Sequence, residues 1–160
     1  MSPRIAAQRI LLILHGSIGD VTRALPLAAL LRAGYPKALI AWSVEPAAAP
    51  LLEGNSMIDE VIRFDRRHWW RSFAAFLRQI RRRKFDLVLD LQRHLKSGVI
   101  SRFSGAPYRL GFHRADTKEF NWLFNNLFIE RCGSSLSKLD HYLKFVEFLG
   151  LSRSPLTWDF

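Results

Sequence analysis

Stretches of consecutive hydrophobic residues alternate with amphipathic stretches along most of the chain. The first hydrophobic stretch, residues 10–14, is bounded by polar residues and predicts a strand that is buried on both faces. After a turn at 15–20, hydrophobic residues recur with helical spacing and predict a helix that begins at Asp20. Pro26 is expected to kink this helix or to end its first segment. The chain is therefore predicted to open with a strand, a glycine-containing turn and a helix.

The same alternation continues to the end of the chain. Further strands are predicted at 39–44, 61–64, 85–91 and 107–112, a loop with a short helix at 45–52, and helices at 66–84, 96–103, 120–127 and 135–149. Strands that alternate with helices predict an α/β fold, here a Rossmann-like parallel sheet with helices on both faces. A chain of 160 residues corresponds to about one domain, and a hydrophobic content of 49% is enough to build a core.

Several classes of protein are excluded by composition. The only cysteine, Cys132, rules out a disulfide framework and a cysteine-rich metal site. The His, Cys, Asp and Glu residues lack the spacing of metal ligands, so we predict neither a metal nor a resident cofactor. No hydrophobic run has the length of a membrane span. The start of the chain is interpreted as the approach to the first strand rather than as a signal peptide.

Positive charge is concentrated in one segment. The net charge is +10, and residues 63–84 carry nine basic residues and one acidic residue. Such an excess favours an anionic partner: a nucleic acid, a phosphorylated lipid or a phosphate-bearing sugar. The alternative is an amphipathic helix with a solvated basic face. Residues 81–84 would complement the end of that helix, whereas Arg66, Arg67 and Arg71 near its start are the better ligand candidates.

Asp20 is the candidate for chemistry. It is predicted to lie at the carboxyl end of the first strand, where open α/β sheets bind ligands. A helix N-terminus favours an ionised carboxylate, which could serve as a general base. Gly16 and Gly19 would allow close approach of a ligand to the backbone. The alternative role of Asp20 is that of a helix N-cap.

The segment ILLILHGSIGDVTRALPLAALL resembles the amino-terminal signature of the heptosyltransferases, glycosyltransferase family nine. Gly19-Asp20 and Leu25-Pro26 match its Gly-Asp turn and its Leu-Pro. The resemblance implies that Asp20 is the catalytic base and that Ser17 and Gly19 contact the acceptor.

Later segments resemble the family in the same order. DLQRHLKSG, which contains Gln92 and Lys96, resembles the polar turn and Lys-Ser that follow the family's middle strand. Both residues are acceptor-binding candidates, with helix capping as the alternative. Lys118, with Arg114 as the other possibility, matches a basic residue that holds an acceptor phosphate or carboxylate. His141 matches a recurrent histidine, interpreted as packed or capping rather than catalytic.

The resemblance implies the amino-terminal half of a GT-B fold. Residues 1–151 would form the acceptor-binding domain, and 152–160 would begin the linker to a missing domain that binds the donor, ADP-heptose. The implied enzyme is an inverting, metal-independent heptosyltransferase that acts on the lipid-linked inner core of lipopolysaccharide. This chain would be inactive alone. We expect a cytoplasmic protein, peripheral on the anionic inner membrane through its basic helix.

Two other functions stay open on the residues alone. The basic helix with interleaved Trp69, Trp70 and Phe73 is compatible with a nucleic-acid-binding α/β module without catalytic activity. Against it, these aromatic residues have core spacing, and no known nucleic-acid-binding motif is present. A Rossmann-like nucleotide-binding protein is the third possibility, but the turn GSIGD lacks the G-x-G-x-x-G pattern.

Overall fold

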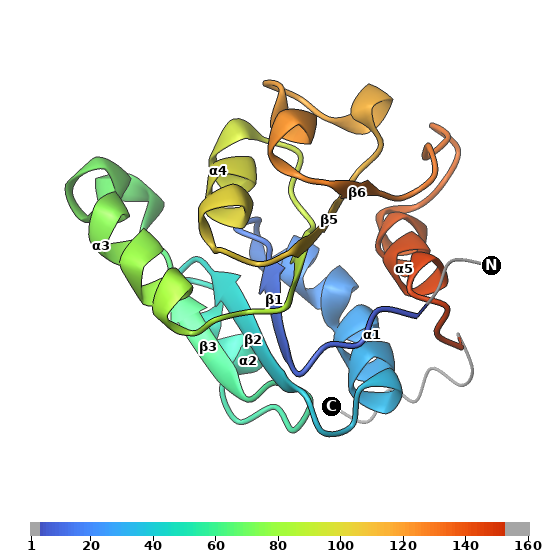
Figure 1. Cartoon of the computed structure of the whole chain (residues 1–160), viewed down its shortest axis with the longest axis horizontal. Coiled ribbons are helices and arrows are strands. Elements are labelled where there is room, and N and C mark those ends of the chain that lie inside the picture. Colours follow the sequence, from blue (N-terminus) through green and yellow to red (C-terminus); the bar gives the residue numbers. More distant parts are fainter. Residues whose placement is uncertain (1–3, 153–160) are drawn as a thin grey trace.

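A parallel sheet of six strands lies at the centre of residues 4–152, which the computed structural model describes (Figure 1). Its strands are β1 (Arg9–Ile13), β2 (Leu39–Val44), β3 (Glu60–Arg63), β4 (Leu87–Asp90), β5 (Tyr108–Gly111) and β6 (Leu127–Phe128). Their order is β3-β2-β1-β4-β5-β6, with every neighbouring pair parallel. This is the doubly wound order of a Rossmann-like sheet, so the predicted fold is confirmed.

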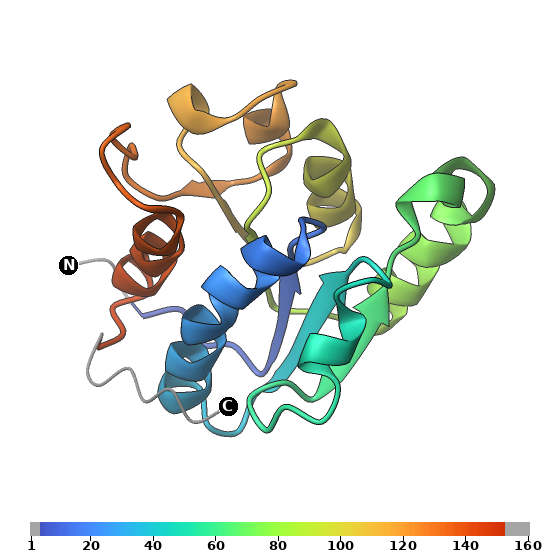
Figure 2. The same ribbon diagram turned by 180° about the vertical axis from the view of Figure 1, so that it is seen from behind.

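Helices cover both faces of the sheet, as the two opposite views in Figures 1 and 2 show. The α-helices are α1 (Ile18–Gly34), α2 (Ala49–Leu52), α3 (Trp69–Arg82), α4 (Leu95–Phe103) and α5 (Lys138–Phe148). Short 3₁₀ helices span η1 (Arg66–His68), η2 (Arg114–Asp116) and η3 (Asn121–Phe124). Helices α1, α2 and α5 share one hydrophobic core with the sheet, and α3 and α4 share the other.

Strand β1 feeds both cores because side chains alternate across a strand. Ile10 and Leu12 pack with α1 and α5, whereas Leu11 and Ile13 pack with α3 and α4. All four are fully buried, which explains why this strand reads as an unbroken hydrophobic run.

Most predicted elements occur, with shifted ends. Helix α1 begins at Ile18 rather than at Asp20. It does not end at Pro26 but continues to Gly34. The helix predicted at 66–84 is η1 followed by α3. The last helix begins at Lys138, because Ser137 caps it with a side-chain acceptor for the Asp140 N–H. Of the linker predicted at 152–160, residues 153–160 lie outside the described residues.

The helix predicted at 120–127 is wrong. The segment forms only η3 and then the edge strand β6. Two asparagine side chains, Asn121 and Asn125, hydrogen-bond to the buried carboxylate of Asp90 at 2.8 and 3.0 Å. The chain then pairs with β5. These tertiary contacts outweigh the hydrophobic spacing that predicted a helix, in a segment whose asparagines are poor residues for a helix interior.

Candidate functional site

The turn between β1 and α1 places Asp20 at the carboxyl edge of the sheet. Ser17 is the N-cap of α1, and Asp20 is the third helical residue. The Asp20 Oδ2 atom accepts hydrogen bonds from the Ser17 backbone N–H (3.2 Å) and the Ser17 hydroxyl (3.1 Å). Asp20 is therefore not the N-cap itself but the acidic member of a capping box. At Gly16 a Cβ would lie 2.7 Å from Asp20 Oδ2, so a glycine there leaves room for this carboxylate.

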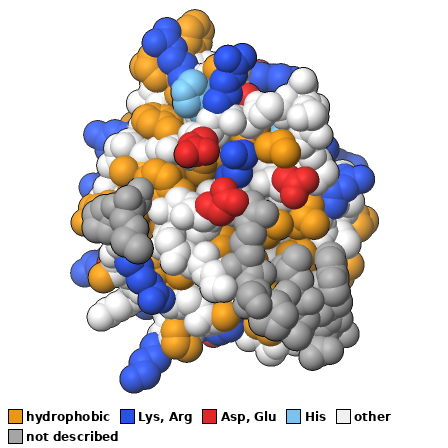
Figure 3. Space-filling view, turned by 90° about the vertical axis from the view of Figure 1, so that its right-hand side faces the viewer, with side chains coloured by type: hydrophobic (Ala, Val, Ile, Leu, Met, Phe, Trp, Pro, Cys, Tyr) orange, Lys and Arg blue, Asp and Glu red, His pale blue; other side chains and the backbone are white. Residues whose placement is uncertain are grey.

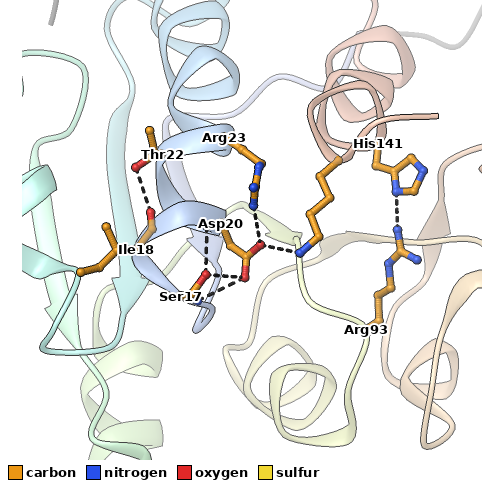
Figure 4. Close-up of polar contacts among 8 residues, drawn as sticks. Ser17, Ile18, Asp20, Thr22, Arg23, Arg93 and His141 are labelled. Carbon is orange, nitrogen blue, oxygen red and sulfur yellow. Dashed lines mark hydrogen bonds and ion pairs between the residues drawn. The ribbon is translucent and has the colours of Figure 1, made fainter.

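A lysine from the far end of the chain contacts the same carboxylate. The ammonium group of Lys138, the first residue of α5, donates to Asp20 Oδ1 at 2.7 Å, and Arg23 lies 3.5 Å from that oxygen (Figure 4). Partial burial raises the pKa of Asp20, but hydrogen bonds from Lys138 and Ser17 outweigh this effect and lower the pKa below its ordinary value. Asp20 is therefore ionised at neutral pH.

Asp20 lines a pocket of about 310 Å³ at this edge of the sheet. The other lining residues are Leu14, Leu91, Gln92, Arg93, His94, Phe112, Lys118, Lys138, His141 and Tyr142. Burial, followed by the nearby Asp20 charge, raises the pKa of Tyr142 to about 12, so its hydroxyl stays protonated. The pocket therefore combines one carboxylate with several cations and neutral hydrogen-bonding groups, which suits a polar, anionic ligand. We call it the Asp20 pocket.

Gln92 and Lys96, the two acceptor-binding candidates after β4, line two adjoining pockets. With its amide oxygen facing the turn, Gln92 accepts hydrogen bonds from the backbone N–H groups of His15 and Gly16, both at 3.0 Å. Gln92 therefore holds the Asp20 turn as well as lining the pocket. Lys96 lines an adjoining pocket of about 250 Å³ that shares Gln92 and His94 with the first.

Asp90, at the end of β4, organises the segment that carries Lys118. Its carboxylate is fully buried and accepts hydrogen bonds from Asn121, Asn125 and the backbone N–H of Gln92. Burial is the largest influence and raises the pKa of Asp90 to about 6, although these hydrogen bonds oppose the rise. Asp90 thus ties η3 to the end of β4.

Of the remaining predicted residues, only Lys118 lines the Asp20 pocket in the part of the chain that the structure describes. This residue is exposed. Gly19 lies in the first turn of α1, where an added Cβ would meet only ordinary contacts, and it is not among the lining residues. Arg67 and Arg71 are exposed on η1 and α3 and line neither described pocket; the side chain of Arg66 is outside the described part.

Helix α3 keeps its predicted amphipathic character. Phe76 and Ile80 are buried against the sheet. On the outer side, Trp70 is 61% exposed, and the Arg71 guanidinium lies 4.6 Å from the centre of its ring. Arg83, just after α3, pairs with Glu60 of β3, so part of the basic segment has a structural role.

Residues 4–152 contain no group of three or more His, Cys, Asp or Glu side chains placed to hold a metal ion. None of the helices in this part combines the length and the hydrophobicity that crossing a bilayer requires.

Sequence reasoning missed Lys138, Arg93 and Tyr142 as parts of the site. Lys138 lies 118 residues from Asp20, and no local pattern distinguishes it from other helical lysines. Arg93 was visible as part of the polar run after β4, the edge where ligands bind. His141, predicted to be packed or capping, lies edge-on to the Phe112 ring and also lines the Asp20 pocket.

Comparison with known proteins relates the chain to one family. The sequence profile of glycosyltransferase family 9 (heptosyltransferase) matches residues 73–152, half of the chain. Lipopolysaccharide core heptosyltransferase OpsX of Haemophilus influenzae is 27% identical over 89% of this chain, which covers 41% of that protein. Lipopolysaccharide heptosyltransferase 1 of Pseudomonas aeruginosa is 28% identical, and the chain covers 34% of it. The chain thus spans well under half the length of these relatives.

Solved structures agree with the fold. E. coli heptosyltransferase WaaC with ADP superposes with a TM-score of 0.79 and 25% identity, over 93% of this chain and 49% of that chain. E. coli ADP-heptose lps heptosyltransferase II gives a TM-score of 0.73 at 22% identity, which supports the fold alone. The sheet is consistent with one Rossmann-like half of the GT-B arrangement. From its sequence profile and its fold, the chain belongs to glycosyltransferase family 9, the heptosyltransferases.

Proposed function

We propose that this chain is the acceptor-binding half of an inverting glycosyltransferase that transfers heptose from ADP-heptose to the inner core of lipopolysaccharide. The observation that carries the proposal is the ionised Asp20 carboxylate in a pocket at the carboxyl edge of the sheet. In this proposal the described residues 4–152 supply acceptor binding, and the donor would be bound by another part of the full-length enzyme. That these relatives are lipopolysaccharide heptosyltransferases favours this function over a nucleic-acid-binding module.

In the proposed reaction, Asp20 removes the proton from an acceptor sugar hydroxyl. The hydroxyl oxygen forms the new bond to the anomeric carbon of the heptose, while the bond from that carbon to ADP breaks and ADP leaves with the electron pair. The capping box and Lys138 hold Asp20 in place and keep it ionised. General-base assistance of this kind requires no metal.

Cations around the pocket would bind the acidic groups of the acceptor. Lys118 lines the Asp20 pocket, and Lys96 lines the pocket beside it. Arg67 and Arg71 would hold acceptor groups farther from the reacting hydroxyl, such as Kdo carboxylates or lipid A phosphates; Arg66 stays a candidate from the sequence. Arginine suits such groups because its guanidinium pairs bidentately with them.

Transfer by the full natural protein that contains this sequence tests the proposal. The protein is incubated with ADP-heptose and a Kdo-lipid A acceptor, and ADP release is measured together with the mass of the lipid product. We expect one ADP per added heptose, and no reaction when ADP-heptose is replaced by UDP-glucose. If no acceptor is glycosylated while RNA binds tightly in a filter assay, the nucleic-acid-binding function replaces this one.

The basic outer side of α3 supports a second part of the proposal, a cytoplasmic protein that attaches to the anionic face of the inner membrane. Each Lys or Arg near such a surface contributes about 1 kcal/mol. The double variant Arg67→Gln/Arg71→Gln is therefore expected to bind vesicles with 30% phosphatidylglycerol about thirtyfold more weakly in sedimentation at low salt. Lys37→Gln/Arg102→Gln, which removes two exposed charges elsewhere, serves as the control. Equal losses in the two variants, or binding that ignores salt, would refute attachment through α3.

A further inference from the structure

A cavity of about 620 Å³ adjoins the Asp20 pocket on the side of α5. Three residues line both: Arg93, Lys118 and His141. The rest of its wall comes from 115–117 and 131–134. We call this the outer cavity. Because these three residues form a wall that both share, the outer cavity lies directly beside the Asp20 pocket.

The shared wall is built around Arg93. Its guanidinium lies 4.2 Å from the centre of the Phe112 ring, and one of its nitrogens is 2.6 Å from His141 Nδ1. Figure 4 shows the Arg93 and His141 side chains pointing toward one another. A ring face and an imidazole nitrogen hold the guanidinium in place without neutralising its charge.

The histidine that holds Arg93 is uncharged at neutral pH. Burial, followed by the Arg93 charge, lowers the pKa of His141 below its ordinary value. A neutral imidazole can accept the Arg93 N–H at Nδ1, so the pair keeps the single positive charge of the arginine.

Cations outnumber anions around the outer cavity. Arg93, Lys118 and Arg131 line it, and none of them pairs with a carboxylate within residues 4–152. The one carboxylate in the lining, Asp116, accepts a hydrogen bond from the Cys132 backbone N–H at 2.7 Å. In the view onto α5, Lys and Arg side chains and a histidine gather at the upper end of the surface (Figure 3). An excess of oriented cations in a concave site favours an anionic ligand.

We propose that the outer cavity is an anion-binding subsite, in which Arg93 selects acceptors that carry a carboxylate or phosphate beside the sugar at Asp20. The proposal rests on the proposed function for the sugar, but the anion site itself does not depend on catalysis. Arg93 would pair bidentately with the anionic group while Phe112 and His141 keep its orientation. Lys118 and Arg131 would add charge from the other walls.

Anion binding to the 160-residue chain tests the subsite without an activity measurement. The ¹⁵N-labelled chain is titrated in phosphate-free buffer with two probes, inorganic phosphate and the methyl glycoside of Kdo, while backbone and arginine side-chain signals are followed by NMR. We expect the Arg93 side chain and residues 115–118 and 131–134 to shift together. Arg93→Gln should weaken binding at least tenfold, and Arg93→Lys should bind with intermediate affinity because it keeps the charge but loses the fork. Arg102→Gln, which removes an exposed charge on α4, should bind like the wild type.

The two probes distinguish the sources of the anion. Saturable binding of phosphate alone assigns the subsite to a phosphorylated acceptor, and binding of the Kdo glycoside alone assigns it to a carboxylate. Wild-type affinity of Arg93→Gln for both probes, or shifts confined to α3, would overturn the proposal. If Arg93→Gln does not fold, Arg131→Gln takes its place, with an expected weakening of about threefold. If anions bind at Arg93 but the full protein transfers no sugar, the proposed function alone is refuted. If the protein transfers sugar at the same rate with Arg93→Gln and no anion binds, the subsite alone is refuted.

Discussion

Asp20→Asn is expected to lower the rate of heptose transfer by the full natural protein about a thousandfold. A positioned general base contributes roughly 10²- to 10⁴-fold, and an amide cannot take the proton of the acceptor hydroxyl. Because the pKa of Asp20 lies below its ordinary value, the carboxylate stays ionised above pH 5, and its protonation should cause no loss of wild-type kcat/KM between pH 5 and pH 8. The measurement is ADP release, at saturating donor and acceptor for the rate of each variant and at subsaturating acceptor for the pH profile of kcat/KM.

The chain provides a matched control for the structural role of Asp20. Helix α5 begins with a second capping box, in which Asp140 Oδ2 accepts hydrogen bonds from the Ser137 hydroxyl (2.6 Å) and backbone N–H (3.3 Å). Asp140→Asn should lose a similar capping contribution, about 1 kcal/mol, but retain transfer within a few fold of the wild type. If the two variants lost transfer equally, Asp20 would be a capping residue and not the base.

The raised pKa of the buried Asp90 carboxyl is expected to appear in the pH dependence of the free energy of unfolding. Because the pKa of this buried carboxyl is raised from 3.8 to about 6, the native protein holds the proton more tightly than the unfolded chain does. The free energy of unfolding contributed by Asp90 therefore falls as the pH rises from about 4 to about 6 and is constant above that. The raised pKa corresponds to about 3 kcal/mol. The difference in unfolding free energy between the wild type and Asp90→Asn, from urea denaturation, should thus favour the wild type by about 2 kcal/mol more at pH 4 than at pH 7, because the unfolded chain is itself partly protonated at pH 4.

Asp59 offers a control of opposite sign. Burial raises the pKa of Asp59, but hydrogen bonds from the Ile40 N–H and Arg32 outweigh burial and lower it. Its contribution to stability is therefore present at neutral pH and is lost as the pH falls below about 4. Asp59→Asn should change the pH profile only in that acidic range. A wild-type profile parallel to that of Asp90→Asn from pH 4 to pH 7 would contradict a raised pKa for Asp90.

The strands and helices whose hydrophobic pattern determines which of their faces is buried were predictable from the sequence. Both faces of the strands at 10–14 and 39–44 are hydrophobic, so both faces are buried only if helices cover the two sides of the sheet. The amphipathic pattern of 66–84 determined which side of α3 packs on the sheet. The position of Asp20 followed from the same logic, since a turn after a buried parallel strand must lie at the ligand-binding edge.

The tertiary structure alone decided which side chains meet at that edge. Lys138 reaches Asp20 across 118 residues, and Arg93 meets His141 across 48, so neither contact leaves a local signal in the sequence. The segment 120–127 has hydrophobic residues at helical spacing. In the folded protein, however, Asn121 and Asn125 hydrogen-bond to Asp90, and the end of the segment pairs with β5 as a strand. Hydrophobic periodicity records where a segment is buried and therefore determines the layers of this fold. The polar contacts of the site depend on distances between separate elements, which exist only after those layers have packed.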